Sequence, residues 1–94
     1  MSISEGMTDP TTAGALIERC VSAGVEARRT HARLLALEAQ HPPAAAADLT
    51  RARAEAERLS RAYRESQRPL AAAGLGQFQS RLAQVQHRIA ERLQ

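Results

Sequence analysis

The side chains that could do nucleophilic, acid–base or metal chemistry are few in this sequence, and their spacing does not group them. The histidines His31, His41 and His87 lie on different segments, and no two have the i, i+3 or i+4 spacing of metal ligands on one helix face. Cys20 precedes His31 by about 16 Å along a helix, which is too far for a thiol nucleophile and its base. We therefore expect Cys20 to be a small packing residue. One cysteine is also too few for an intrachain disulfide or a structural zinc site.

Carboxylates and glycine-rich loops are no better placed for catalysis. Glu55 with Glu57, and Glu18 with Glu26, are the acidic pairs available on helices, and none has the histidine of a Glu-x-x-His di-metal site. The Gly-Leu-Gly segment at 74–76 lacks the third glycine and the preceding strand of a dinucleotide-binding loop. The sequence therefore predicts no enzyme activity, no cofactor and no metal.

Arginine supplies all of the basic side chains apart from histidine. The 94-residue chain has 13 arginines, no lysine and 10 acidic residues, which gives a formal charge of +3. Six of the arginines fall between residues 51 and 68, in RARAEAERLSRAYRESQR. Guanidinium groups bind phosphates and carboxylates, so nucleic acid or an acidic protein is an admissible partner. A GC-rich genome would produce the same bias toward arginine and alanine, so the charge alone identifies no partner.

The segment 68–88 has the spacing of a helix-turn-helix. Ala72, Gly76, Leu82 and Val85 match the small residue, the turn glycine and the two buried positions of that motif. A proline and a second glycine in the expected first helix speak against it, and an alanine-rich sequence meets this spacing easily. The side chains that could then contact DNA are Gln77, Gln79, Arg81, Gln84 and Arg88.

The first predicted helix covers residues 10–41. Asp9 is a suitable N-cap, and Pro10 suits the first helical position. Pro42 and Pro43 end the helix, because proline lacks a backbone donor and restricts the residue before it. Small and apolar residues recur along this helix at alternating steps of four and three, which is the heptad spacing of packed helices. They are Leu16, Cys20, Ala23, Ala27, Thr30, Leu34 and Leu37.

The second predicted helix covers residues 44–67 and has a seam of the same period. Its members are Ala45, Leu49, Ala52, Ala56, Leu59, Tyr63 and Ser66. Two matched seams joined by a short loop predict an antiparallel helical hairpin, in which Ala27 lies near Ala56 and Cys20 near Tyr63. On this heptad, five arginines of the basic stretch point outward: Arg51, Arg58, Arg61, Arg64 and Arg68.

A third helix is predicted over residues 75–93, after a break at Pro69. The first helix also carries apolar residues away from its main seam, more than one partner helix can cover. Either the third helix covers them within the chain, or a second copy does. Because only 20 residues have large apolar side chains, we expect a homo-oligomer. The residues predicted to make these contacts are Ile17, Val21, Val25, Leu35, Leu75, Phe78, Leu82, Val85 and Ile89.

These patterns predict an all-α protein: a long, coiled-coil-like antiparallel hairpin with a third C-terminal helix, completed by oligomerisation. Residues 10–94 form a single helical domain after a flexible segment at 1–9. No apolar run approaches the ~18 residues of a membrane span, and no signal peptide is evident, so we expect a cytoplasmic protein that does not enter membranes. The predicted function is a non-catalytic protein-interaction module, such as an assembly subunit, adaptor or small chaperone. The alternative is a small basic DNA-binding regulator.

Overall fold

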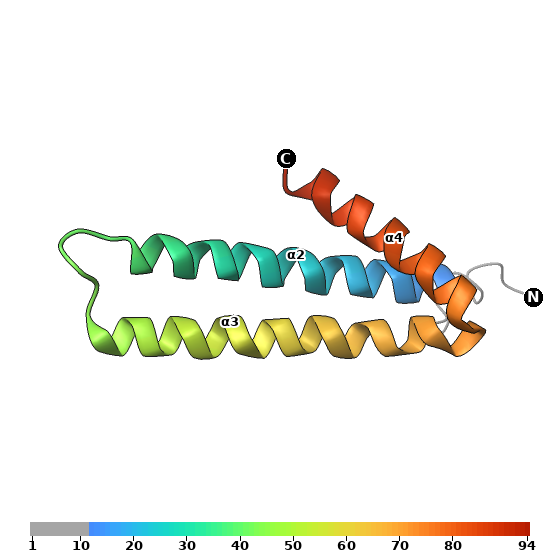
Figure 1. The fold of residues 1–94 in the computed structure, drawn as a ribbon, viewed down its shortest axis with the longest axis horizontal. Helices are drawn as coiled ribbons and strands as arrows, with labels where there is room; N and C mark the ends of the chain where they lie inside the picture. Colours follow the sequence, from blue (N-terminus) through green and yellow to red (C-terminus); the bar gives the residue numbers. More distant parts are fainter. Residues whose placement is uncertain (1–11) are drawn as a thin grey trace, which may run out of the picture.

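The computed structural model describes residues 12–94, and this part of the chain is helical apart from short connections. Its elements are the helices α2 (Ala13–Glu38), α3 (Ala46–Gln67) and α4 (Leu75–Arg92), with the 3₁₀ helix η1 (Arg68–Ala73) between α3 and α4. α2 and α3 form an antiparallel hairpin, and α4 crosses α2 at the end of the hairpin opposite the loop (Figure 1). The molecule is elongated, with principal extents of 60 × 30 × 23 Å. The predicted all-α class and the hairpin are confirmed.

The helix α2 begins later than the sequence predicted. Its N-cap is Thr12, whose hydroxyl oxygen accepts a hydrogen bond from the backbone N–H of Ala15 at 3.2 Å. Threonine satisfies the free donors of a first turn in the same way as aspartate. The predicted cap and first residue, Asp9 and Pro10, lie outside the described residues. The helix that packs in the hairpin therefore starts at Ala13.

The loop between α2 and α3 is longer than predicted. α2 ends at Glu38 and α3 begins at Ala46, so the predicted limits of 41 and 44 are corrected by a few residues. Pro42 and Pro43 lie within this loop, and neither can donate a backbone hydrogen bond to extend a helix. The peptide bond between His41 and Pro42 is cis.

The seam between α2 and α3 is made of the small residues that the heptad spacing indicated. Two contacts across it set the register. Near the loop, Arg53 pairs with Glu38 at 3.3 Å. Near the other end, Ser66 interacts with the Cys20 thiol, and Tyr63, expected beside Cys20, packs against the core cluster to which Cys20 belongs. The buried members of the seam are Cys20, Ala27, Thr30, Leu34 and Ala56.

The outer face of α3 is charged and exposed, as its heptad pattern predicted. Each of four arginines in the basic stretch pairs with an acid three or four residues before it, at 2.5 to 3.9 Å. Such exposed pairs contribute about 0–1 kcal/mol each and offset much of the local charge. The pairs are Arg51 with Asp48, Arg58 with Glu55, Arg61 with Glu57, and Arg68 with Glu65.

A single glycine redirects the chain from η1 into α4. Gly74 has a φ of 99°, in the left-handed region that disfavours any side chain. The break predicted at Pro69 is instead the second residue of η1, where proline is tolerated because the first N–H groups of a helix have no partner within it. α4 then begins at Leu75, as predicted, and ends at Arg92.

The helix α4 completes the core within the single chain. Its residues Val85 and Ile89 are fully buried and pack into one cluster with Leu70 of η1 and with α2. At the surface, both Arg88 and Arg92 of α4 pair with Glu18 of α2. The second apolar stripe of α2, which the sequence left to a third helix or a second copy, is therefore covered by α4 over its first three residues. These are Ile17, Val21 and Val25.

Candidate protein-interaction site

The cover that α4 gives to α2 stops about halfway along the hairpin. Val21 and Val25 are buried beneath α4, with exposures of 0% and 5%. Counted from Val21 in steps of seven residues, the same face of α2 continues to Arg28 and then to Leu35. Leu35 is 53% exposed, although it belongs to the same stripe. A stripe that is core in one half of the hairpin is therefore open to solvent in the other half.

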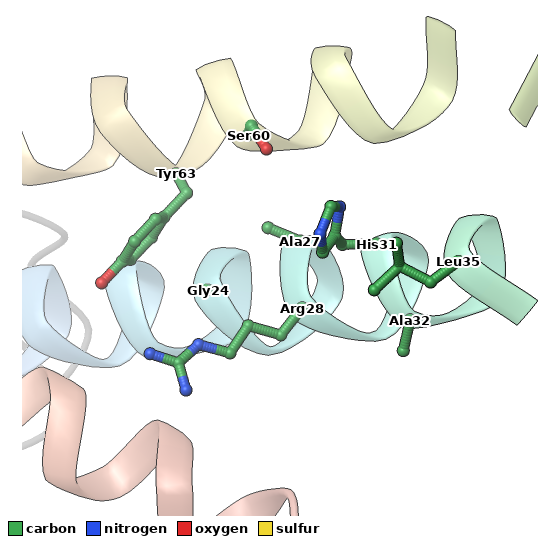
Figure 2. A pocket seen from close by; sticks show the side chains of 8 residues that line it. All are labelled: Gly24, Ala27, Arg28, His31, Ala32, Leu35, Ser60 and Tyr63. Carbon is green, nitrogen blue, oxygen red and sulfur yellow. The ribbon is translucent and has the colours of Figure 1, made fainter. Parts of the chain in front are cut away.

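This open half of the stripe forms one wall of a groove between α2 and α3. The groove has a volume of about 490 Å³. Six of its eight lining residues come from α2 and two from α3; in Figure 2, Tyr63 and His31 lie between the two helices, whereas Arg28 and Ala32 lie on the side of α2 away from α3. Along α2 it runs from Gly24 to Leu35, eleven steps of 1.5 Å or about 16 Å, which is three helical turns. The lining residues are Gly24, Ala27, Arg28, His31, Ala32, Leu35, Ser60 and Tyr63.

The boundary between the covered half and the open half lies at Gly24. A Cβ atom added there would be 2.9 Å from Cε1 of Tyr63 and would also meet the side chain of Ile89. The absence of a side chain thus lets α3 and α4 approach α2 at the same point. Tyr63 then forms the end wall of the groove nearest to α4 (Figure 2).

The remaining lining is apolar except for two nitrogen-bearing side chains and one hydroxyl. In Figure 2, Arg28 extends along α2 toward the end where α4 lies, and the His31 ring stands between α2 and α3. Both side chains belong to exposed residues. Ala32 and Leu35 form the opposite end of the groove. The groove therefore combines an apolar end near the loop with a cationic end near α4.

The structure separates the residues that the sequence predicted to contact a partner. Five of them are buried within this chain and are accessible to no partner in this conformation: Ile17, Val21, Val25, Val85 and Ile89. Phe78 and Leu82 are half-buried, whereas Leu75 is 72% exposed in the first turn of α4. Of the residues predicted to contact a partner, only Leu35 lines the groove. Sequence reasoning missed Arg28 and His31, although Arg28 lies seven residues after Val21 on the same face.

The segment with helix-turn-helix spacing takes a different conformation from that motif. The turn occurs at Gly74, whereas Gly76, the expected turn residue, lies inside α4. The helix before the turn is the six-residue η1, which continues directly from α3. Of the candidate DNA contacts, Arg88 is engaged by Glu18 and Arg81 is half-buried. Gln77, Gln79 and Gln84 are exposed on α4.

Cys20 and His31, the thiol and imidazole considered as a nucleophile and its base, lie in different environments. Burial raises the pKa of the Cys20 thiol, and the hydrogen bond with Ser66 opposes this shift in part. Cys20 is fully buried in the seam, whereas His31 lines the exposed groove. Over residues 12–94, no three side chains among His, Cys, Asp and Glu lie together in a way that could hold a metal ion.

Comparisons with known proteins assign no function to the chain. No protein family, no curated protein and no solved structure matches the chain. None of the helices that the structure describes combines the length and apolar character needed to cross a membrane.

Proposed function

We propose that this chain is a non-catalytic protein-interaction module, which binds a helix of another protein in the groove between α2 and α3. The observation that carries this proposal is the exposure of Leu35, at 53%, on a stripe whose other apolar members are core residues. A partner helix laid beside α2 would take the place that α4 occupies in the other half of the hairpin. Amphipathic helices bind grooves of this kind through residues at i, i+3, i+4 and i+7.

The dimensions of the groove support a helical occupant. Its three-turn length suits a short helix, and its walls are the ridges of two antiparallel helices. Ala27 and Ala32 line it with small side chains, so a third helix can approach closely. The proposed roles are those of an adaptor, an assembly subunit or a small chaperone for the partner's helix.

A homo-oligomer is the second candidate, and two observations favour it. The chain has few large apolar side chains for its length. Leu75 is also 72% exposed at the start of α4, away from the groove, so a second apolar contact is available to another copy. In such an assembly the copies would shield Leu35 or Leu75 from solvent.

Site-specific photocrosslinking in the cells that make this protein tests the proposal. A benzophenone amino acid replaces Leu35 in one variant and Arg61 in another. Arg61 is 62% exposed on the outer face of α3, so it is a matched control outside the groove. We expect an adduct with one other protein from position 35 and none from position 61. Equal adducts from both positions, or none from position 35, contradict the proposal, and adducts of the chain with itself establish the oligomer.

Titration with duplex DNA separates these candidates from the DNA-binding alternative. Binding through phosphate contacts weakens steeply as salt rises. If the chain binds duplex DNA at low salt and Arg81→Ala weakens that binding, the basic-regulator hypothesis replaces the interaction module. We expect no such binding, because the turn of the segment is at Gly74 and Arg88 is paired with Glu18.

A further inference from the structure

The charges of the groove indicate what kind of helix it accepts, provided that the proposed function holds. Arg28 and His31 line the groove, and none of its eight lining residues is acidic. Among residues 12–94, no carboxylate forms an ion pair with Arg28. The guanidinium therefore stands beside apolar surface without a counter-charge from the described part of the chain.

The other carboxylates of this part of the chain are not available to neutralise Arg28. Of the eight acidic side chains in residues 12–94, six are in ion pairs with other arginines, and Glu91 lies 3.7 Å from His87. The exception is Glu26, which lies two residues from Arg28 and so points to the far side of α2. A docked helix that brings its own carboxylate would supply the missing charge, in a setting where apolar contacts exclude water and strengthen the pair.

A second copy of this chain fits the groove less well. The same surface of a second copy has Arg28 but no acidic lining residue, so it would bring no carboxylate to the Arg28 guanidinium. A nucleic acid would neutralise Arg28, but it would leave Leu35 and Ala32 against a charged backbone. An apolar surface with a cationic end is matched best by an amphipathic helix that carries acid on its apolar margin.

We propose that the occupant of the groove is an acidic amphipathic helix of another protein, whose carboxylate pairs with Arg28 while its apolar residues pack on Ala32 and Leu35. Arg28 and Leu35 are seven residues apart on α2, or about 10 Å. A helix that lies along α2 meets both with residues seven positions apart. The recognition pattern is therefore a large apolar residue and a glutamate or aspartate separated by two turns.

Binding of designed peptides to the purified 94-residue chain tests this inference. Four stapled helical peptides of about four turns are used, because unconstrained helices of this length are marginally stable in water. The first carries leucine and glutamate seven positions apart. The second has glutamine in place of that glutamate, and the third has arginine. The fourth has the composition of the first, with the glutamate moved to the opposite face.

Two variants with the same change of charge provide the control. Arg28→Glu alters the groove, whereas Arg29→Glu alters the next residue, which is exposed and lies about 100° around α2, outside the lining. Fluorescence anisotropy measures the Kd of each combination, and circular dichroism verifies that both variants remain helical. We expect Arg28→Glu to raise the Kd of the glutamate peptide about tenfold, the effect of one charge-assisted hydrogen bond, and to lower the Kd of the arginine peptide. Arg29→Glu should leave the Kd of both peptides nearly unchanged.

The outcomes distinguish a wrong partner from a wrong site. If the glutamine peptide binds as tightly as the glutamate peptide and Leu35→Glu abolishes both, the groove binds helices but the acidic partner is wrong. Equal effects of Arg28→Glu and Arg29→Glu overturn the inference in the same way, because they indicate attraction by overall charge. If no peptide binds and position 35 gives no crosslink in cells, the proposed function fails as well. A stable dimer that Leu35→Arg dissociates, and that the peptides cannot disrupt, identifies a second copy as the occupant.

Discussion

Gly24 of α2 and Ile89 of α4 lie so close that a Cβ atom added to Gly24 would meet the end of the Ile89 side chain. The same atom would be 2.9 Å from the ring of Tyr63 on α3. Three helices therefore converge on one position that has no side chain. The contact also marks where the core ends and the groove begins, because Gly24 lines the groove while Ile89 is fully buried.

We expect Gly24→Ala to lower the free energy of unfolding by about 1 kcal/mol, because overpacking outweighs the gain in helix propensity. Urea unfolding followed by circular dichroism measures this. Ile89→Val removes the atom nearest to the new Cβ. In the otherwise unaltered protein this change should lower the free energy of unfolding by roughly 0.5–1.5 kcal/mol, and in the Gly24→Ala variant it should lower it by less. Gly14→Ala is the control, since a Cβ there meets nothing within 4 Å. Equal stability of the two alanine variants would show that the convergence is looser than described.

A second prediction concerns the carboxylate that joins α4 to α2. Hydrogen bonds from Arg92 and then Arg88 hold the pKa of Glu18 below its ordinary value of 4.5. A carboxylate with a lowered pKa stabilises the folded state above its ordinary pKa, and this stability is lost as pH falls through the lowered value. We expect Glu18→Gln to reduce stability at pH 7 by less than about 1 kcal/mol, since both sides of the pair are partly exposed.

The difference in free energy of unfolding between the unaltered protein and Glu18→Gln should shrink as pH falls below 4.5, because protonation removes the same charge from the unaltered protein. High salt should also reduce it. The control is Glu26→Gln on the exposed side of the same helix, where no ion pair with residues 12–94 is lost. Thermal unfolding across the acidic range compares the three proteins. A deficit that stays constant with pH would show that the arginine contacts of Glu18 do not stabilise α4.

A third prediction compares two leucines on either side of Gly74. Leu70 of η1 is fully buried in the core, whereas Leu75 is 72% exposed. Leu70→Ala should lower the free energy of unfolding by about 2–5 kcal/mol, which is a large share of the stability of so small a domain. Leu75→Ala should change it by no more than about 0.5 kcal/mol. Denaturant midpoints measure both, and similar losses from the two changes would contradict the position of η1.

The fourth prediction concerns thiol reactivity. Cys20 is inaccessible in the seam, and burial raises the pKa of its thiol, so both access and thiolate formation are limited. We expect Ellman's reagent to react with the native protein on the order of 100-fold more slowly than with the protein in urea, since exposure requires the helices to separate. Prompt labelling of the native chain would mean that the hairpin opens readily or that Cys20 lies elsewhere.

The hairpin was predictable from the sequence because its signals are local. The alternating steps of four and three define one face of each helix, and the pair Pro42–Pro43 ends the first helix without reference to the rest of the chain. Arg51 and Arg61 were assigned to the outer face of the second helix on the same basis, and both are exposed. Errors of a few residues at the helix ends arise because caps depend on individual side chains such as Thr12.

The groove could not be predicted, because it depends on where α4 lies and how far it reaches. The sequence showed that Ile17, Val21, Val25 and Leu35 exceed what one helix can cover, yet it did not specify which of them a third helix would meet. Arg28 was overlooked because a search for apolar periodicity passes over charged residues. Its position on the stripe becomes significant only because Arg28 lies beyond the core cluster that α2 forms with α4 and lines the groove.

The single turn at Gly74 has a mechanical consequence for the whole molecule. α4 has 18 residues and is therefore about 27 Å long, and the turn at Gly74 sets its direction. A rotation of roughly 10° at this turn displaces the far end of the helix by nearly 5 Å, about one helical pitch. In the last turns of α4, Ile89 packs near Gly24 and Arg92 pairs with Glu18, so the torsion angles of Gly74 decide whether these contacts with α2 can form.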